Sequence, residues 1–315
     1  MLTPPFFSGQ QVAASLAYAT LVDALAKAFR GGVEAPERHH HTIPVPGGSD
    51  ATLLLMPAWM PGRYVGTKIA QVFPDNGALG LPSVQSVYLL FDGRTGQLLA
   101  TLDGSELTTR RTVAASSLAV RYLARPEASR LLIMGTGQVA GQIAASHASV
   151  RPINSVAVWG RDAGRAADLV RRLGGQGFAA SVVTDLPREV AAADIVSCGT
   201  LSRVPLVLGD WLSPGTHLDL IGGFTPAMRE VDDAAIRRAT IVIDTAAAIT
   251  EAGDIASPLR DDVIGRDAIQ TDLAGLVTGA HPGRRSAEEI TLFKSVGAAI
   301  EDLAAAALCY ERLSP

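Results

Sequence analysis

The chain of 315 residues contains only two cysteines and no apolar run long enough to cross a membrane. Cys198 and Cys309 stand far apart, in no spacing typical of a metal site. Isolated thiols of this kind are typical of proteins that stay in a reducing compartment. A bilayer-spanning helix needs about 20 consecutive apolar residues. The sequence therefore predicts reduced thiols, and it does not indicate a membrane partner.

An excess of positive charge is also lacking. The chain carries 27 Lys and Arg residues against 31 Asp and Glu residues, a formal net charge of −4. Nucleic-acid-binding proteins normally show a basic stripe, so nucleic acid is not an expected partner. The first residues hold no basic segment before an apolar stretch, so we expect no signal peptide. Together with the reduced thiols, this favours a cytoplasmic protein.

The length and composition indicate a globular protein of two domains. Hydrophobic residues make up 48% of the chain and charged residues 18%, which is enough apolar material for a sizeable core. A chain of 315 residues exceeds the usual length of one domain. We therefore expect two domains that differ in their pattern of strands and helices.

The first third of the chain predicts helices around an antiparallel sheet. Spaced apolar residues over 8–29 predict one helix, and residues 106–124 predict another. Between them lie short extended runs at 41–45, 52–56, 65–72, 84–91 and 97–102. The sequence Asp92-Gly93-Arg94-Thr95-Gly96 has the residues of a hairpin turn joining the last two runs.

From Arg130 onward, short aliphatic runs alternate with alanine-rich stretches. The expected strands are 131–134, 155–159, 180–183, 195–197, 217–221 and 241–243. Such alternation is typical of βαβ units and predicts an α/β fold with a Rossmann-type doubly wound parallel sheet. Residues 290–308 predict one apolar-rich helix that packs back on the first domain.

A glycine turn follows the first strand of this second block. It reads Gly135-Thr136-Gly137-Gln138-Val139-Ala140 and leads into a predicted helix. A pyrophosphate needs backbone N–H groups and a helix N-terminus, with no Cβ in the way. The turn predicts that Gly135, Thr136, Gly137, Gln138 and Val139 bind a nicotinamide dinucleotide. The alternative is a glycine turn in an α/β domain that binds none.

The end of the next strand bears on the choice between NADH and NADPH. An acid at that position holds the ribose hydroxyls of NAD, whereas an arginine pairs with the 2′-phosphate of NADP. Here Arg161 comes first and Asp162 second. We therefore expect NADPH to be preferred over NADH. The alternative for Arg161 is a solvated side chain at the start of a helix.

Several separated segments resemble the ornithine cyclodeaminase/mu-crystallin family over almost the whole chain. These segments are Pro36-Glu37-Arg38-His39-His40, Met56-Pro57-Ala58-Trp59, Gly66-Thr67-Lys68, Phe73-Pro74-Asp75-Asn76, Leu107-Thr108-Thr109-Arg110-Arg111-Thr112, and Phe293-Lys294-Ser295-Val296-Gly297 with Glu301-Asp302. The resemblance implies a homodimer of two-domain chains. The motifs are nearest to the ketimine and 1-pyrroline-2-carboxylate reductases of that family. Residues 1–115, completed by 290–315, would form the substrate and dimerisation domain, and residues 116–289 the Rossmann domain.

The same resemblance implies roles for individual residues. Arg38, Lys68 and Arg111 match the family's cationic site for the substrate carboxylate, and Lys68 is also the candidate catalytic residue. Arginine forks with a lysine beside them suit a planar carboxylate. The alternative for each cation is a surface charge, which we expect for Arg110.

Four further positions match residues near the cofactor or substrate in relatives. Ser83, Thr200 and Gly222 are expected to contact the cofactor, and Ser295 the substrate. The alternative for the hydroxyl residues is a polar loop or a helix cap, because such residues have the same sequence pattern.

One departure from the family pattern bears on the reaction. Relatives that cyclise ornithine carry an Asp soon after the glycine that ends the fifth Rossmann strand, and this chain has Phe224 there. Leu53-Leu54-Leu55 is also uniformly aliphatic where an acid is usual. Burying the distal ammonium of a diamino acid without a carboxylate is costly. The sequence therefore favours reduction of a cyclic imino acid with NADPH.

Other functions remain open alongside this one. They are the cyclodeaminase itself, an alanine-type amino-acid dehydrogenase, and a crystallin-like protein that keeps NADPH without catalysis. His39-His40-His41 does not predict a metal site, because consecutive side chains of an extended segment point to alternating faces.

Overall fold

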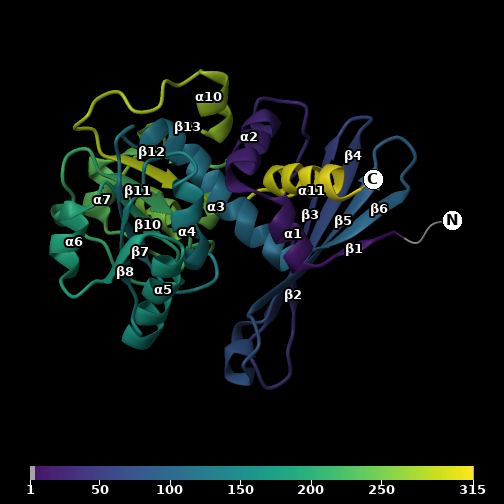
Figure 1. Ribbon diagram of the computed structural model, residues 1–315, viewed down its shortest axis with the longest axis horizontal. Helices are drawn as coiled ribbons and strands as arrows, with labels where there is room; N and C mark the ends of the chain where they lie inside the picture. The colour runs from purple at the N-terminus through teal and green to yellow at the C-terminus, as the bar shows by residue number, and fades with distance from the viewer. Residues whose placement is uncertain (1–3, 315) are drawn as a thin grey trace. The chain divides into compact units, whose positions relative to one another are not determined.

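Two sheets organise the protein in the computed structural model, which describes residues 4–314 (Figure 1). Unit 1 comprises the described residues up to Arg111 together with those from Ala298 onward. Unit 2 comprises Thr112–Gly297. The boundary in the chain falls inside α3 (Gly104–Leu123).

The sheet of unit 1 has six strands in the order β1-β6-β5-β4-β3-β2. The strands are β1 (Phe6–Phe7), β2 (His39–Ile43), β3 (Ala51–Met60), β4 (Tyr64–Val72), β5 (Val84–Asp92) and β6 (Leu98–Asp103). Strands β2 to β6 pair antiparallel with their neighbours, as predicted, and β1 runs parallel to β6. The predicted hairpin turn is confirmed, because Asp92 accepts hydrogen bonds from the N–H groups of Arg94 and Thr95.

One face of this sheet carries the core of unit 1. Met56, Lys68, Tyr88 and Leu102 share a row across β3 to β6 and are all buried. The helix α11 (Ala299–Leu313) packs on β3, β4 and β5, and also on α2 (Tyr18–Phe29). Side chains that alternate with the buried row belong to the opposite face, where they are half-exposed.

The predicted helix over residues 8–29 is wrong in its middle. The structure has two helices there, α1 (Gly9–Ser15) and α2, which are bent by 81°. Arginines from distant segments bond the carbonyls at the break: Arg312 donates to Ser15 O at 2.8 Å and Arg110 to Leu16 O at 3.1 Å. Arg110 is therefore not the surface charge expected from the sequence. No single helix in the described part of the chain is long and apolar enough to cross a membrane; α1 and α2 pass that test only as a bent pair.

The sheet of unit 2 has eight parallel strands in the order β13-β12-β14-β11-β10-β7-β8-β9. The strands are β7 (Arg130–Met134), β8 (Ser155–Trp159), β9 (Ala179–Val182), β10 (Ile195–Cys198), β11 (His217–Leu220), β12 (Thr240–Ile243), β13 (Ile269–Asp272) and β14 (Thr291–Lys294). The chain order reverses between β7 and β10, which is the switch point of a doubly wound sheet. The predicted fold class, a Rossmann-type parallel sheet with a second α/β unit, is confirmed.

The predicted single helix over residues 290–308 is wrong at its start. Thr291–Lys294 form β14, which lies between β11 and β12, and the helix α11 begins only at Ala299. A buried strand and a buried helix have equally apolar sequences, so the run Ile290–Phe293 could not be assigned from periodicity.

Helices cover the parallel sheet on both faces. They are α4 (Ala140–His147), α5 (Ala163–Gly175), α6 (Leu186–Ala192), α7 (Asp233–Arg238), α8 (Ala248–Glu251), α9 (Gly253–Arg260) and α10 (Leu273–Thr278). Leu132 and Met134 of β7 share a core with Val190 of α6 and Ile255 of α9. The alternate residue Ile133 is buried as well, so the sheet is covered on its other face.

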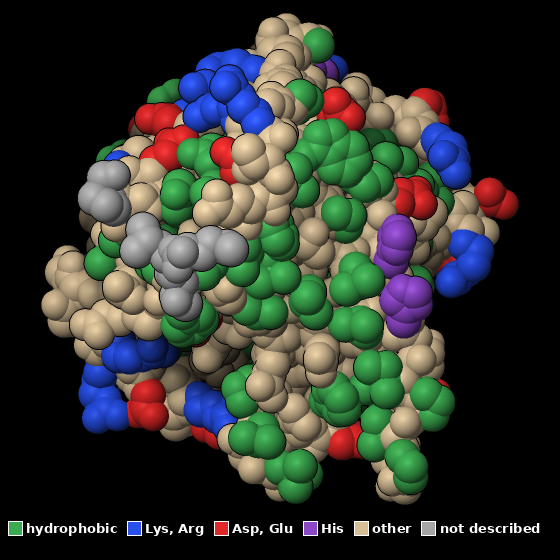
Figure 2. All heavy atoms as spheres, turned by 90° about the vertical axis from the view of Figure 1, so that its right-hand side faces the viewer, with side chains coloured by type: hydrophobic (Ala, Val, Ile, Leu, Met, Phe, Trp, Pro, Cys, Tyr) green, Lys and Arg blue, Asp and Glu red, His purple; other side chains and the backbone are tan. Residues whose placement is uncertain are grey.

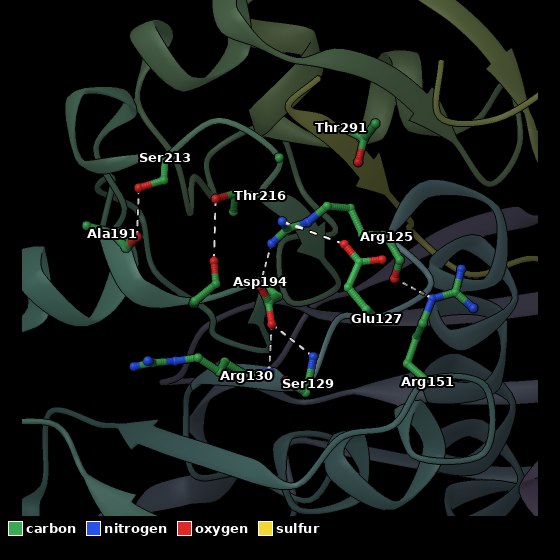
Figure 3. A network of polar contacts seen from close by, with 12 residues as sticks. Arg125, Glu127, Ser129, Arg130, Arg151, Ala191, Asp194, Ser213, Thr216 and Thr291 are labelled. Atoms are coloured by element: carbon green, nitrogen blue, oxygen red, sulfur yellow. Dashed lines mark hydrogen bonds and ion pairs between the residues drawn. The ribbon is translucent and has the colours of Figure 1, made fainter. Parts of the chain in front are cut away.

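A polar network pins the amino ends of the central strands (Figure 3). Asp194, directly before β10, accepts hydrogen bonds from the N–H groups of Ser129 and Arg130 at 2.9 and 3.0 Å, which ties it to the start of β7. Arg125 pairs with the same carboxylate. Arg151 donates to carbonyl oxygens at the end of α3, where a cation also complements the helix dipole. The loops at the carboxyl ends of the strands thus extend from a sheet whose central strands are fixed at their amino ends.

Candidate active site

The glycine turn has the shape that a pyrophosphate requires. Gly135 adopts a φ of +115°, and a Cβ there would lie 2.7 Å from the carbonyl oxygen of Gly199, so no other residue fits. A Cβ on Gly137, in contrast, would meet no atom within 4 Å. The turn ends at α4, which begins at Ala140. An open backbone surface beside a helix N-terminus fits a phosphate group.

Three further residues predicted to contact the dinucleotide follow strands of unit 2. Arg161 follows β8, Thr200 follows β10 and Gly222 follows β11. Ser295 directly follows β14, is buried, and donates its backbone N–H to Leu220 O at 3.2 Å. Because the carboxyl ends of parallel strands meet at one edge, the fold brings these positions to the same edge as the glycine turn. Their individual contacts with cofactor or substrate stay predictions.

Arg161 and Asp162 differ in what they already bond. Asp162 is the N-cap of α5, where its carboxylate accepts the N–H of Arg165 at 3.1 Å. Arg161 is exposed at the end of the strand. The acid is therefore engaged by its own helix, whereas the side chain of Arg161 is exposed.

Unit 2 contains a group of three buried charged residues, which we call the Lys294 cluster: Lys294, Glu230 and Asp254. Lys294 Nζ lies 3.3 Å from Asp254 Oδ2 and 3.9 Å from Glu230 Oε2, and all three side chains are fully buried. Burial raises the pKa of Glu230 to about 7, although Lys294 opposes this shift. Two carboxylates thus share one cation in the interior of unit 2.

Phe224 is the residue for which the family resemblance led us to expect an acid in a cyclising enzyme. It follows the glycine pair after β11, and it is partly buried against the hydrophobic core of unit 2. The side chain at this position is therefore apolar, and its ring can neither accept a proton nor form an ion pair with an ammonium.

Unit 1 has its own buried charged group, the Lys68 cluster: Lys68, Arg111, Glu301 and Asp302. Lys68 Nζ lies 2.8 Å from Asp302 Oδ2, and Arg111 bonds Glu301 at 2.7 Å and Asp302 at 2.9 Å. The two carboxylates belong to the first turn of α11, where the helix dipole favours negative charge. Two of the three cations predicted from the sequence therefore lie together.

The electrostatics of the Lys68 cluster set the protonation of its lysine. Burial and, to a smaller extent, the nearby Arg111 lower the pKa of Lys68 to about 8, and Asp302 opposes both effects. Tyr88 pairs with Lys68 across β4 and β5, and burial raises the pKa of its phenol well above the ordinary value. Its hydroxyl is buried and makes no hydrogen bond to the described residues. At neutral pH the lysine is therefore mostly protonated, beside a neutral phenol.

Arg38 and Ser83, the other predicted site residues of unit 1, lie in separate segments of the chain. Arg38 is half-exposed directly before β2. Ser83 directly precedes β5, and its carbonyl accepts the N–H of Phe73 at 2.8 Å. Roles for Arg38 and Ser83 in the site stay predictions.

The sequence reasoning assigned no role to several residues that complete these clusters. Glu301 and Asp302 were part of the family resemblance, and adjacent acids at a helix start were the available signal. Lys294 ends an otherwise apolar strand, which indicates a buried charge. Glu230 and Asp254 had no such signal, because their partners lie far away in the sequence.

The parallel sheet, its switch point and the glycine turn define a Rossmann-type protein with a second α/β unit. Its sequence matches the profile of the ornithine cyclodeaminase/mu-crystallin family over residues 6–315, and the chain belongs to this family. The resemblance seen in the separated motifs is thereby confirmed.

Individual relatives are similar over nearly the whole chain. A Δ1-pyrroline-2-carboxylate reductase of Paracoccus denitrificans is 39% identical over 87% of this chain and 90% of its own length. The structure of the Thermococcus litoralis Δ1-pyrroline-2-carboxylate reductase, in complex with NADH and L-proline, matches with a TM-score of 0.92 and 31% identity over 98% of this chain and 96% of that one. An archaeal alanine dehydrogenase dimer with bound NAD matches with a TM-score of 0.90 and 29% identity, over 98% and 95%.

Proposed function

We propose that the protein reduces a cyclic imino acid of the 1-pyrroline-2-carboxylate type, with a reduced nicotinamide dinucleotide as the hydride donor. The observation that carries this proposal is the Lys68 cluster. It buries a lysine and an arginine that suit a carboxylate, in a chain that has Phe224 where cyclising relatives have an acid. The similar reductases of P. denitrificans and T. litoralis support the same reaction.

The residues of unit 2 fit the dinucleotide. The turn Gly135–Val139 would hold the pyrophosphate, because Gly137 presents open backbone beside the start of α4. Arg161 would pair with a 2′-phosphate, since Asp162 already caps α5. Thr200 and Gly222 would be further cofactor contacts in this unit, and Ser83 of unit 1 is another proposed cofactor contact. We therefore propose a preference for NADPH over NADH.

The residues of unit 1 would orient the substrate and manage its proton. A guanidinium fork from Arg111 and the charge of Lys68 would fix the substrate carboxylate, with Arg38 and Ser295 as further contacts. Bound NADPH supplies a hydride to the carbon of the C=N bond. The electron pair of that bond moves to the nitrogen, which takes one proton. Lys68, with a pKa of about 8, is suited to give this proton at neutral pH.

Phe224 favours this reaction over ornithine cyclodeamination. The distal ammonium of ornithine needs a carboxylate partner when it is buried, and a phenylalanine ring offers none. An alanine-type dehydrogenase and a protein that only stores NADPH are the further alternatives. The imino acid is favoured because its ring carries a single carboxylate and no distal charge.

A homodimer through unit 1 is part of the proposal. Leu55, Ile69, Leu89 and Phe91 belong to the outer face of its sheet, and all are only half-buried. Figure 2, in which the right-hand side of Figure 1 faces the viewer, shows many hydrophobic side chains on the face that it presents. The similar archaeal alanine dehydrogenase is a dimer. Light scattering should give twice the chain mass, and Ile69→Lys should yield monomer.

We also propose a cytoplasmic location, since both described cysteines are free and buried.

The experiment that tests the function offers the protein both kinds of substrate. Purified protein is assayed with 1-pyrroline-2-carboxylate and its six-membered homologue against NADPH and NADH, and separately with ornithine and NAD+. We expect oxidation of NADPH that depends on a cyclic imine, and no proline from ornithine. Release of ammonia and proline from ornithine at about 1 s⁻¹ or faster, an ordinary enzymatic rate, would overturn the argument from Phe224.

A further inference from the structure

The carboxylate of Glu230 ties together two loops at the carboxyl edge of the unit 2 sheet. One oxygen accepts hydrogen bonds from the N–H and the hydroxyl of Thr200, both at 2.8 Å. The other accepts the N–H of Gly222 at 3.0 Å and of Gly223 at 3.4 Å. One fully buried side chain thus bonds the loop after β10 and the loop after β11 at once.

These two loops approach each other closely at Gly222. A Cβ on Gly222 would lie 1.9 Å from the carbonyl oxygen of Thr200 and 2.6 Å from Glu230 Oε1. Four donors converge on the two oxygens of one carboxylate, and an ionised carboxylate is the side chain that accepts from all of them. The site selects a carboxylate and leaves no space for a larger group.

Asp254 holds the backbone of Glu230 in this position. Asp254 accepts the backbone N–H groups of Glu230 and Val231 at 2.7 and 3.2 Å, which fixes the segment that carries Glu230. Lys294 lies beneath, nearer to Asp254 than to Glu230. Buried charges of this kind are costly unless they are paired and hydrogen-bonded. Their retention at the cofactor edge indicates a role there.

We propose that Glu230 is a positioning residue for the nicotinamide end of the cofactor site. Its ionised form holds Thr200 and Gly222 in place, and its protonated form releases a backbone N–H group from its acceptor. The inference rests on the proposed function, because it takes these two loops to border the bound nicotinamide.

The surroundings of Glu230 make the ionisation of its carboxyl group, and so its hydrogen bonds to the two loops, dependent on pH. Lys294 faces the carboxyl group from β14, Asp254 from α9, and Thr200 from the loop after β10. Cys198 of β10 is also near, and burial raises the pKa of its thiol well above the ordinary value, so the thiol stays neutral. The pKa of Glu230 is raised to about 7, so this group loses its proton as the pH rises through neutrality. Affinity for the dinucleotide should therefore increase over the same range.

The test measures the dissociation constant of NADH by fluorescence, at pH values on either side of the Glu230 pKa of about 7. NADH is used because the 2′-phosphate of NADPH itself titrates, with a second pKa of about 6. The wild type should bind roughly ten-fold more weakly on the acid side, as expected from the loss of a charged hydrogen bond. Glu230→Gln should bind that weakly at both pH values. Glu289→Gln, a carboxylate before β14 at the other edge, should match the wild type.

A second variant keeps the inference testable if Glu230→Gln does not fold. Lys294→Met removes the cation that lowers the pKa of Glu230, so the midpoint of the affinity change should move to higher pH. An unchanged midpoint, or a Glu230→Gln protein with the affinity and pH profile of the wild type, would overturn the inference alone. A wild type that binds neither NADH nor NADPH would overturn the proposed function and this inference with it.

Discussion

The two units bury charged clusters that differ in their balance of positive and negative side chains. The Lys68 cluster pairs two cations with two carboxylates at 2.7 to 2.9 Å. The Lys294 cluster sets one cation among two carboxylates at 3.3 and 3.9 Å. Burial shifts the pKa of a lysine to about 8 in the first and of a glutamate to about 7 in the second.

The difference between the clusters follows from what each must hold. The carboxylate of Glu230 accepts backbone N–H groups, so it organises the protein's own loops. The Lys68 cluster has equal numbers of positive and negative side chains, and a substrate carboxylate would add a negative charge. Arg38, the third cation of the proposed carboxylate site, would restore the balance. We therefore expect unit 1 to bind the substrate anion and unit 2 the cofactor.

The largest expected effect in unit 2 comes from Gly137→Val. The first carbon of the new side chain meets no protein atom, so the fold should be kept, but it occupies the space that a pyrophosphate needs. Dinucleotide binding should fall below detection in a fluorescence titration, with an unfolding temperature near that of the wild type. A variant that still binds NADPH tightly would remove the glycine turn from the cofactor site.

The corresponding change in unit 1 is Arg111→Lys, which keeps the charge but loses the fork. Losing one partner of a buried charged hydrogen bond costs about 2–5 kcal/mol, or roughly 30- to several-thousand-fold. The kcat/KM for the cyclic imine should fall by at least the lower factor while NADPH affinity is kept. Arg63→Ala, which removes an exposed arginine paired with Glu311 of α11, serves as the control and should have little effect. Equal activity in the two variants would contradict the proposed carboxylate site.

The fold could be predicted where the signal is local. Aliphatic runs gave nearly all strands, and the glycine turn could be located because its steric requirements involve consecutive residues. The break between α1 and α2 could not be predicted, because the carbonyls that it frees are bonded by Arg110 and Arg312 from far along the chain. For the same reason the partners of Glu230 could not be predicted: its contacts with Asp254 and Lys294 join separate elements.

A pH profile separates the lysine of unit 1 from the glutamate of unit 2. The pKa of Lys68 is lowered to about 8, so this side chain is protonated below that pH and loses its proton above it. Imine reduction in the wild type should therefore fall about ten-fold per pH unit above 8, since only the protonated form donates. Lys68→Arg keeps a permanent charge, so its remaining activity should lose this alkaline limb. The same limb in both proteins would assign the titration to another group.

The smallest expected effect is on the choice of cofactor. Arg161→Ala removes the exposed guanidinium proposed to pair with the 2′-phosphate, while Asp162 still caps α5. NADPH should bind about ten-fold more weakly, in line with one charged hydrogen bond, and NADH should be almost unaffected. Equal losses for the two cofactors in paired titrations would be evidence against the NADPH preference.

Isotope transfer tests the central claim most directly. The protein is incubated with 1-pyrroline-2-carboxylate and NADPH that carries deuterium at both C4 positions, and the product is analysed by mass spectrometry and NMR. The proposed reaction predicts proline with one deuterium on Cα, formed in step with NADPH oxidation and lost in Arg111→Lys and Gly137→Val. Proline without deuterium, or NADPH oxidation without proline, would contradict hydride transfer to the C=N carbon.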